Sequence, residues 1–195
     1  MKKLLIAFLV FFSIIYIYIF TYDKKIYYFS ITNNNNLKNE KEIANYFKNN
    51  NILETHVDKF NNCDNRIIDY IYMLNNNEVK KVKNKNISFK NALVKADVIS
   101  IALIPNDQDF SNTYKTINYR NDLIKFIDKI REYSKEDIFV IGIDTENKDK
   151  IIISNIIKIN NEIKEYCKIQ KIYFIDFTEN YSSSIIKQVK STTLG

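Results

Sequence analysis

Histidine is nearly missing from this chain, which contains only His56. A serine hydroxyl becomes a good nucleophile only with a base in hydrogen-bond reach, and histidine serves most often. His56 lies about four residues before the end of an expected strand, Glu54–Phe60, or roughly 13 Å from that end at ~3.3 Å per residue. We therefore expect a half-exposed strand histidine and no conventional base for serine catalysis.

Cysteine is also scarce. Cys63 and Cys167 are the only two, and they are too far apart in sequence for a metal motif or a disulfide framework. Two free buried thiols are the favoured interpretation, with one disulfide as the alternative. We expect no metal site and no cofactor.

Two glycines, one proline and no tryptophan accompany many Asn, Lys, Ile and Tyr residues. This bias is typical of an AT-rich genome and carries no functional information. The asparagine clusters at 33–36 and 75–77 are accordingly predicted to be loops, in preference to a prion-like role.

The first 24 residues lack the features of a cleaved leader. Lys2 and Lys3 precede an uncharged stretch, Leu4–Phe20, of about 17 residues, near the lower limit for crossing a bilayer. No small-x-small cleavage site and no lipid-accepting cysteine follow, whereas tyrosines form an interfacial belt. We expect residues 1–24 to be an uncleaved signal anchor, a single pass in the cell membrane, with residues 25–195 as one extracytoplasmic domain.

The net charge of +6 is not concentrated in one basic stripe. Four of the lysines flank residues 4–20, and the others are mixed with Asp and Glu. Nucleic-acid binding is therefore disfavoured, since it requires a basic patch. Weak attraction to anionic envelope polymers or lipids stays open.

Beyond residue 24, β-rich apolar runs alternate with segments of helical periodicity. The predicted strands are Lys25–Ser30, Glu54–Phe60, Asp97–Ile104, Asp137–Ile143 and Lys171–Asp176. The predicted helices are Leu37–Asn50, Asn65–Asn75, Ser88–Lys95 (with Ser88 as N-cap), Ile117–Ser134 and Lys150–Cys167. This alternation predicts an α/β fold of three layers, a doubly wound five-stranded parallel sheet in the order 2-1-3-4-5. The ending Ser-Thr-Thr-Leu-Gly is not typical of a helix.

Sites in such folds lie at the carboxyl ends of the strands. All the expected ends carry polar residues: Ser30 and Thr32, Asn61 to Arg66, Asn106 and Asp107, Asp144, and Asp176 and Thr178. Because these residue types also form turns, we interpret Asp144 and Thr178 as ordinary loop residues.

Three of these ends together resemble the SGNH, or GDSL, hydrolase family over roughly residues 25–178. The matching segments are Tyr28-Phe29-Ser30-Ile31-Thr32, the stretch from Phe60 to Asp69 with Arg66 and Asp69 in pattern, and Ala96-Asp97 with an apolar strand leading to Pro105-Asn106-Asp107. The resemblance implies Ser30 as the nucleophile and Asn106 as an oxyanion donor.

The departures from the family pattern fall on its chemistry. Tyr28 and Phe29 replace Gly-Asp, while Asp64 and Ile104 stand where the second and third blocks have glycine. A carboxylate at position 64 would repel an oxyanion that the family stabilises with an amide. The Asp-x-x-His block has no counterpart after Asp176.

We therefore expect a catalytically degenerate, membrane-anchored SGNH-like protein that acts as a binding or accessory module at the cell envelope. The resemblance suggests glycan or lipid acyl esters as ligands, although fold alone does not identify them. The runner-up is a weak serine esterase, lipase or deacetylase using Ser30 and Asn106, with a base from Asp176 or a partner chain. A structural envelope protein with an empty pocket is the third possibility.

Overall fold

The computed structural model describes residues 27–33, 42–43, 45–46, 49, 53–54, 60, 65–82, 85–103, 105, 107–146, 148–177 and 181–193. The expected anchor, His56, Cys63, Asp64, Ile104 and Asn106 lie outside these residues, so the predictions made for them stay predictions.

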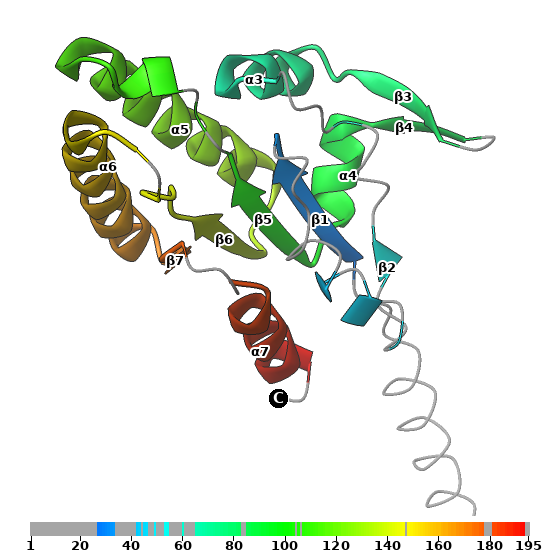
Figure 1. Ribbon diagram of the computed structural model, residues 1–195. Coiled ribbons are helices and arrows are strands. Elements are labelled where there is room, and N and C mark those ends of the chain that lie inside the picture. The colour runs from blue at the N-terminus through cyan, green and yellow to red at the C-terminus, as the bar shows by residue number, and fades with distance from the viewer. Residues whose placement is uncertain are drawn as a thin grey trace, which may run out of the picture.

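A parallel sheet forms the centre of the molecule (Figure 1). Its four main strands run in the order β1 (Tyr27–Thr32), β5 (Val98–Ala102), β6 (Asp137–Ile141) and β7 (Tyr173–Ile175). The two residues of β2 (Leu53–Glu54) pair in parallel with β1 on its other side. The α/β class and the interior position of the Asp97–Ile104 strand are confirmed. Most of the second predicted strand lies outside the described residues.

The strand β5 shows why these residues form the sheet. All five of its residues, Val-Ile-Ser-Ile-Ala, are buried. A nearly continuous apolar run is typical of a parallel strand that is covered on both faces. Both flanking strands pair with β5 in parallel.

One face of the sheet is covered by four helices, α3 (Ile67–Asn75), α4 (Phe89–Lys95), α5 (Thr113–Tyr133) and α6 (Lys150–Ile169). A 3-10 turn, η2 (Asp107–Phe110), precedes α5. Phe29 and Ile31 of β1 belong to this core, and the ring of Phe89 lies edge-on to that of Phe29 at 5.4 Å. Four of the five predicted helices are thereby confirmed, including the Ser88 cap, whose side chain accepts from the Asn91 amide.

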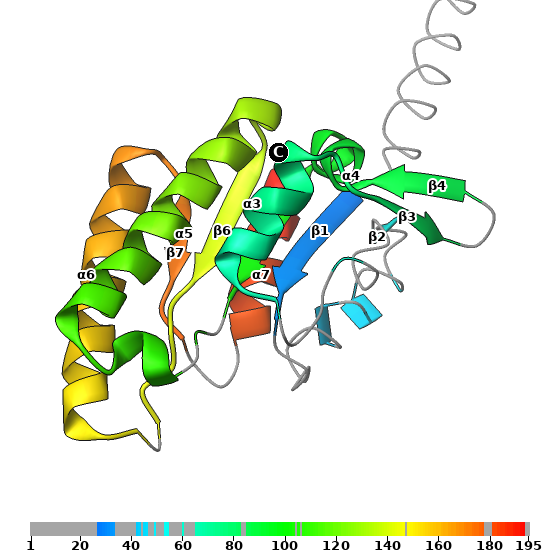
Figure 2. The ribbon, with the colours of Figure 1, turned by 90° about the horizontal axis from the view of Figure 1, so that it is seen from above.

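The opposite face carries α7 (Tyr181–Thr193), which Figure 2 shows across the sheet from α3 and α5. Its buried residues Tyr181, Ile185 and Val189 recur every fourth position and join Tyr28 and other sheet residues in a second core. Ile43, helical like the other described residues of the predicted Leu37–Asn50 helix, joins the same core.

The prediction for the chain's ending was wrong, because α7 continues through Ser191 to Thr193. Its apolar stripe on the sheet outweighs the low helix propensity of its serines and threonines.

A two-stranded antiparallel hairpin, β3 (Val79–Val82) and β4 (Lys85–Ser88), was not predicted. It follows α3 through a turn at Asn76 and Asn77, as expected for the second asparagine cluster, whereas Asn75 of that cluster is the last residue of α3. Asn77 has a φ of 48°, a left-handed conformation that asparagine tolerates better than most residues.

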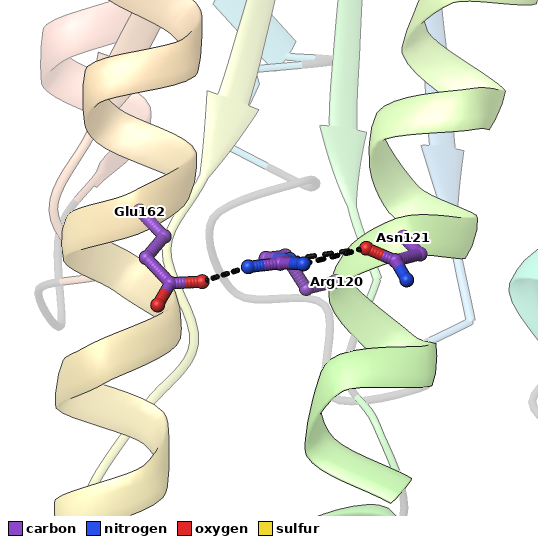
Figure 3. Close-up of polar contacts among 3 residues, drawn as sticks. All are labelled: Arg120, Asn121 and Glu162. Atoms are coloured by element: carbon purple, nitrogen blue, oxygen red, sulfur yellow. Dashed lines mark hydrogen bonds and ion pairs between the residues drawn. The ribbon is translucent and has the colours of Figure 1, made fainter. Parts of the chain in front are cut away.

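Polar contacts join α5 to α6 on the outer side of the core. The Arg120 guanidinium donates to Glu162 at 2.6 Å and is held from the other side by Asn121, as Figure 3 shows. Farther along, the Tyr166 hydroxyl donates to Asp128. These contacts fix the register of the two helices.

Candidate functional site

Ser30, the expected nucleophile, lies inside β1 with two strand residues after it. Phe29 and Ile31 point into the core under α3 to α6. Because side chains alternate along a strand, Ser30 points to the opposite face, which α7 covers. Its side chain is buried, with only 3% of the residue exposed.

The neighbours of Ser30 on this face are polar but buried. Ser100 of β5 is paired with Ser30 in the sheet register, and its hydroxyl is hydrogen-bonded to the Tyr28 hydroxyl at 2.6 Å. Elsewhere on this face, the Ser182 hydroxyl of α7 donates to the half-buried Glu42 carboxylate at 2.6 Å. Among the described residues, every buried side-chain nitrogen or oxygen has a hydrogen-bond partner. The Tyr28–Ser100 pair beside Ser30 is therefore a satisfied polar contact within a mostly apolar core.

Asn106 follows β5, the strand next to β1, but lies outside the described residues. Because β1 and β5 are parallel neighbours, their carboxyl ends lie together at one edge of the sheet. The expected contact between Ser30 and Asn106 itself is untested.

Polar side chains at the carboxyl end of β1 hold the backbone of nearby loops. The Asn33 amide donates to the Asn65 carbonyl at 3.1 Å, and the Asn65 amide donates to the Phe60 carbonyl at 3.1 Å. The buried Tyr70 hydroxyl donates to the Thr32 carbonyl at 2.9 Å. These groups serve loop geometry, as Asn commonly does.

Arg66 and Asp69, which match the family's second block, form a helix start here. The Asp69 carboxylate accepts from the Arg66 amide at 2.7 Å, one half of a capping box at the start of α3. Their match to the pattern is thus explained by local structure alone.

Two carboxylates after the later strands are also engaged. Asp144 accepts from the Glu146 amide at 2.9 Å, a local turn, which confirms its interpretation as a loop residue. Asp176 pairs with Lys164 of α6 at 2.9 Å. Asp176 follows β7, three strands from β1, or roughly 14 Å at ~4.8 Å per strand. It pairs with a helix on the face opposite the Ser30 side chain.

Sequence reasoning missed a side-chain clamp after β6. Asn160 of α6 accepts from the Ile143 amide and donates to the Ile143 carbonyl, both at 2.9 Å. At the preceding Gly142, a Cβ would lie 3.0 Å from the Phe174 ring and 3.3 Å from the Phe177 amide nitrogen, so glycine there leaves room for β7 and the residues after it. The sequence signal for this contact was Asn160, a polar residue next to the buried stripe of Ile156, Ile159 and Ile163 on α6.

Side chains of α5 and α6 also hydrogen-bond to backbone carbonyls between β5 and α5. The Tyr119 hydroxyl donates to the Leu103 carbonyl at 2.9 Å, and the Asn155 amide donates to the Phe110 carbonyl at 2.9 Å. Burial, with a further contribution from Asp109, raises the pKa of Tyr119 far above its ordinary value. Tyr119 is therefore a permanent hydrogen-bond donor and no proton-transfer group near neutral pH.

Metal-binding chemistry has no counterpart in the part of the chain that the structure describes, where no three His, Cys, Asp or Glu side chains gather as ligands would. Cys167 is free and buried, as favoured from the sequence, and burial raises the pKa of its thiol to about 12.

No family model matches the chain, and no curated protein is similar to it. None of the described helices is long and apolar enough to cross a membrane.

Proposed function

We propose that the domain is a divergent, catalytically inactive SGNH-like module that binds ligands or assists other proteins at the cell envelope. Residues 4–20 anchor it in the membrane as a single pass, with the domain outside the cytoplasm. The sheet order 2-1-3-4-5, with β2 as the second strand, belongs to the same proposal. Its ligands are glycans or lipids that carry acyl esters.

The burial of Ser30 is the observation that carries this proposal. A nucleophile must meet an acyl carbon, but the residue is only 3% exposed and lies before the last two residues of its strand. On the face of the sheet to which Ser30 points, Tyr28 and Ser100 are hydrogen-bonded to each other, and α7 packs over the sheet.

A base for Ser30 is also unsupported by the geometry. Asp176, the candidate in the esterase alternative, pairs with Lys164 at the far side of the sheet. Without a base in reach, a serine hydroxyl stays protonated and weakly nucleophilic. The esterase alternative rests on the adjacency of β1, which carries Ser30, and β5, which leads to Asn106, because their carboxyl ends meet at one edge of the sheet.

Hydrolysis of short p-nitrophenyl esters by purified residues 25–195 separates the two functions. We expect no turnover above buffer, and no change in Ser30→Ala or in the matched control Ser184→Ala on α7. Turnover that Ser30→Ala abolishes and Ser184→Ala preserves would establish the esterase. Retention on acetylated but not on deacetylated cell-wall glycan supports the binding role, and equal passage through both contradicts a glycan ester as the ligand.

A further inference from the structure

The β3–β4 hairpin concentrates positive charge that the overall composition conceals. Its strands contain Lys80, Lys81 and Lys85 and no acidic residue. Lys81 and Lys85 are exposed, and Lys80 pairs with Glu78 just before β3. The described part of the hairpin therefore presents a net positive surface.

The hairpin is attached to the body at its base. The Phe89 amide donates to the Glu78 carbonyl at 2.9 Å, and Ile87 packs against the core. The remainder projects from the domain, away from α6 (Figures 1 and 2). The two strands form a sheet of their own and pair with no other described strand. None of its three described lysines belongs to either hydrophobic core.

The base of the hairpin lies near the end of the sheet where β1 begins. Between them is α4, whose seven residues span about 10 Å at ~1.5 Å per residue. Beyond α4, the Asp97 amide donates to the Tyr27 carbonyl at 2.7 Å, and the Tyr27 amide donates to the Asp97 carboxylate. The hairpin and the amino end of β1 thus occupy the same side of the domain.

The short linker between the proposed anchor and β1 limits how far the amino end of β1 can lie from the membrane. Only residues 21–26 separate the anchor segment 4–20 from β1. At ~3.5 Å per extended residue they span at most about 20 Å, which keeps the amino end of β1 close to the bilayer surface.

We propose that the β3–β4 hairpin binds the anionic phospholipid headgroups of the membrane that holds the anchor. This inference rests on the proposed anchoring and adds a second, electrostatic contact to it. Each lysine near an anionic surface strengthens attraction about fivefold, so the three lysines together contribute about a hundredfold before the Glu78 charge reduces it. The contact orients the domain, with the carboxyl end of the sheet turned away from the bilayer.

Amine labelling of the full-length chain in vesicles tests this contact. The protein is reconstituted into phosphatidylcholine alone or mixed with phosphatidylglycerol, and acetylation rates of single lysines are measured by mass spectrometry. Lys158 and Lys168 are exposed on α6, on the other side of the molecule, and serve as internal controls. We expect labelling of Lys80, Lys81 and Lys85 to be severalfold slower in the anionic vesicles only, and the difference to vanish at high salt.

Variants sharpen the result. Lys81→Gln with Lys85→Gln should remove most of the protection of Lys80, whereas Lys158→Gln with Lys168→Gln should preserve it. Equal labelling of the hairpin in both vesicles overturns the proposal, as does protection by a soluble polyanion in neutral vesicles without protection by phosphatidylglycerol. Carbonate extraction of the same vesicles separates the causes: release of the protein refutes the anchor, while pelleted protein with unprotected lysines refutes the hairpin contact alone.

Discussion

At the level of single residues, several of the described polar groups at the strand ends make structural contacts. Asn33 and Asn65 hold loop carbonyls, and Asp69 caps α3. A sequence gives residue type and spacing but not the partner of each hydrogen bond. This is why the polar residues after the strands could be predicted from the sequence while most of their hydrogen-bond partners could not. The loop role predicted for Asp144 agrees with its contact to the Glu146 amide, and Thr178 lies outside the described residues.

The buried Tyr28–Ser100 pair provides a test of the polar core beside Ser30. Tyr28→Phe leaves the Ser100 hydroxyl without this partner, and we expect a loss of about 1–2 kcal/mol in the free energy of unfolding. Ser100→Ala should cost a similar amount, and the double variant clearly less than the sum. Urea denaturation measures all three variants. Additive losses would show that the two hydroxyls do not stabilise each other.

Cys167 tests the packing of α6 against the sheet. In a Cys63→Ala background, we expect the Cys167 thiol to react with Ellman's reagent at pH 8 only as fast as the chain unfolds. Burial raises the pKa of this thiol to about 12 from 9.0, so folded protein holds almost no thiolate at that pH. Because the unfolded thiol ionises first, its contribution to stability should fall as pH rises from about 9 to about 12. Rapid labelling without unfolding would contradict the burial.

Among the helices and strands, those with a clear apolar periodicity were predicted from the sequence, and those with a weak one were missed. The helices α3 to α6 were predicted because their apolar residues recur at helical spacing over buried stripes. The hairpin was missed because β3 has lysines at its two central positions, and nothing in that pattern shows a buried face. The stripe Tyr181, Ile185 and Val189 was the missed signal for α7.

The two hydrogen bonds from Asn160 connect the helix α6 to the backbone that follows β6. Asn160→Ala removes both hydrogen bonds to the Ile143 backbone, and we expect a loss of about 2–3 kcal/mol in the free energy of unfolding. Asn161→Ala, at the exposed neighbouring position, should change it by less than about 0.5 kcal/mol. Thermal and urea unfolding of the two variants give the comparison. Equal stability of both variants would mean that the clamp is dispensable.

In the whole molecule, a parallel sheet with helices on both faces follows from strands that are buried along their length and mostly apolar. The order of β1, β5, β6 and β7 agrees with the expected positions of the first, third, fourth and fifth strands. Activity does not follow from this architecture, because catalysis depends on a few side chains and their distances. Ser30 lies in the first strand, as predicted, but it is buried on the face of the sheet that α7 covers.

The reactivity of Ser30 toward a fluorophosphonate probe decides whether the domain holds an active serine nucleophile. Such probes phosphonylate serines that are both accessible and activated by a base. Incubated with the full-length chain in detergent and analysed by peptide mass spectrometry, the probe should leave Ser30 unmodified, with the same background in Ser30→Ala. A stoichiometric adduct on Ser30 that denaturation before labelling prevents would show an open, activated nucleophile and contradict a catalytically inactive module.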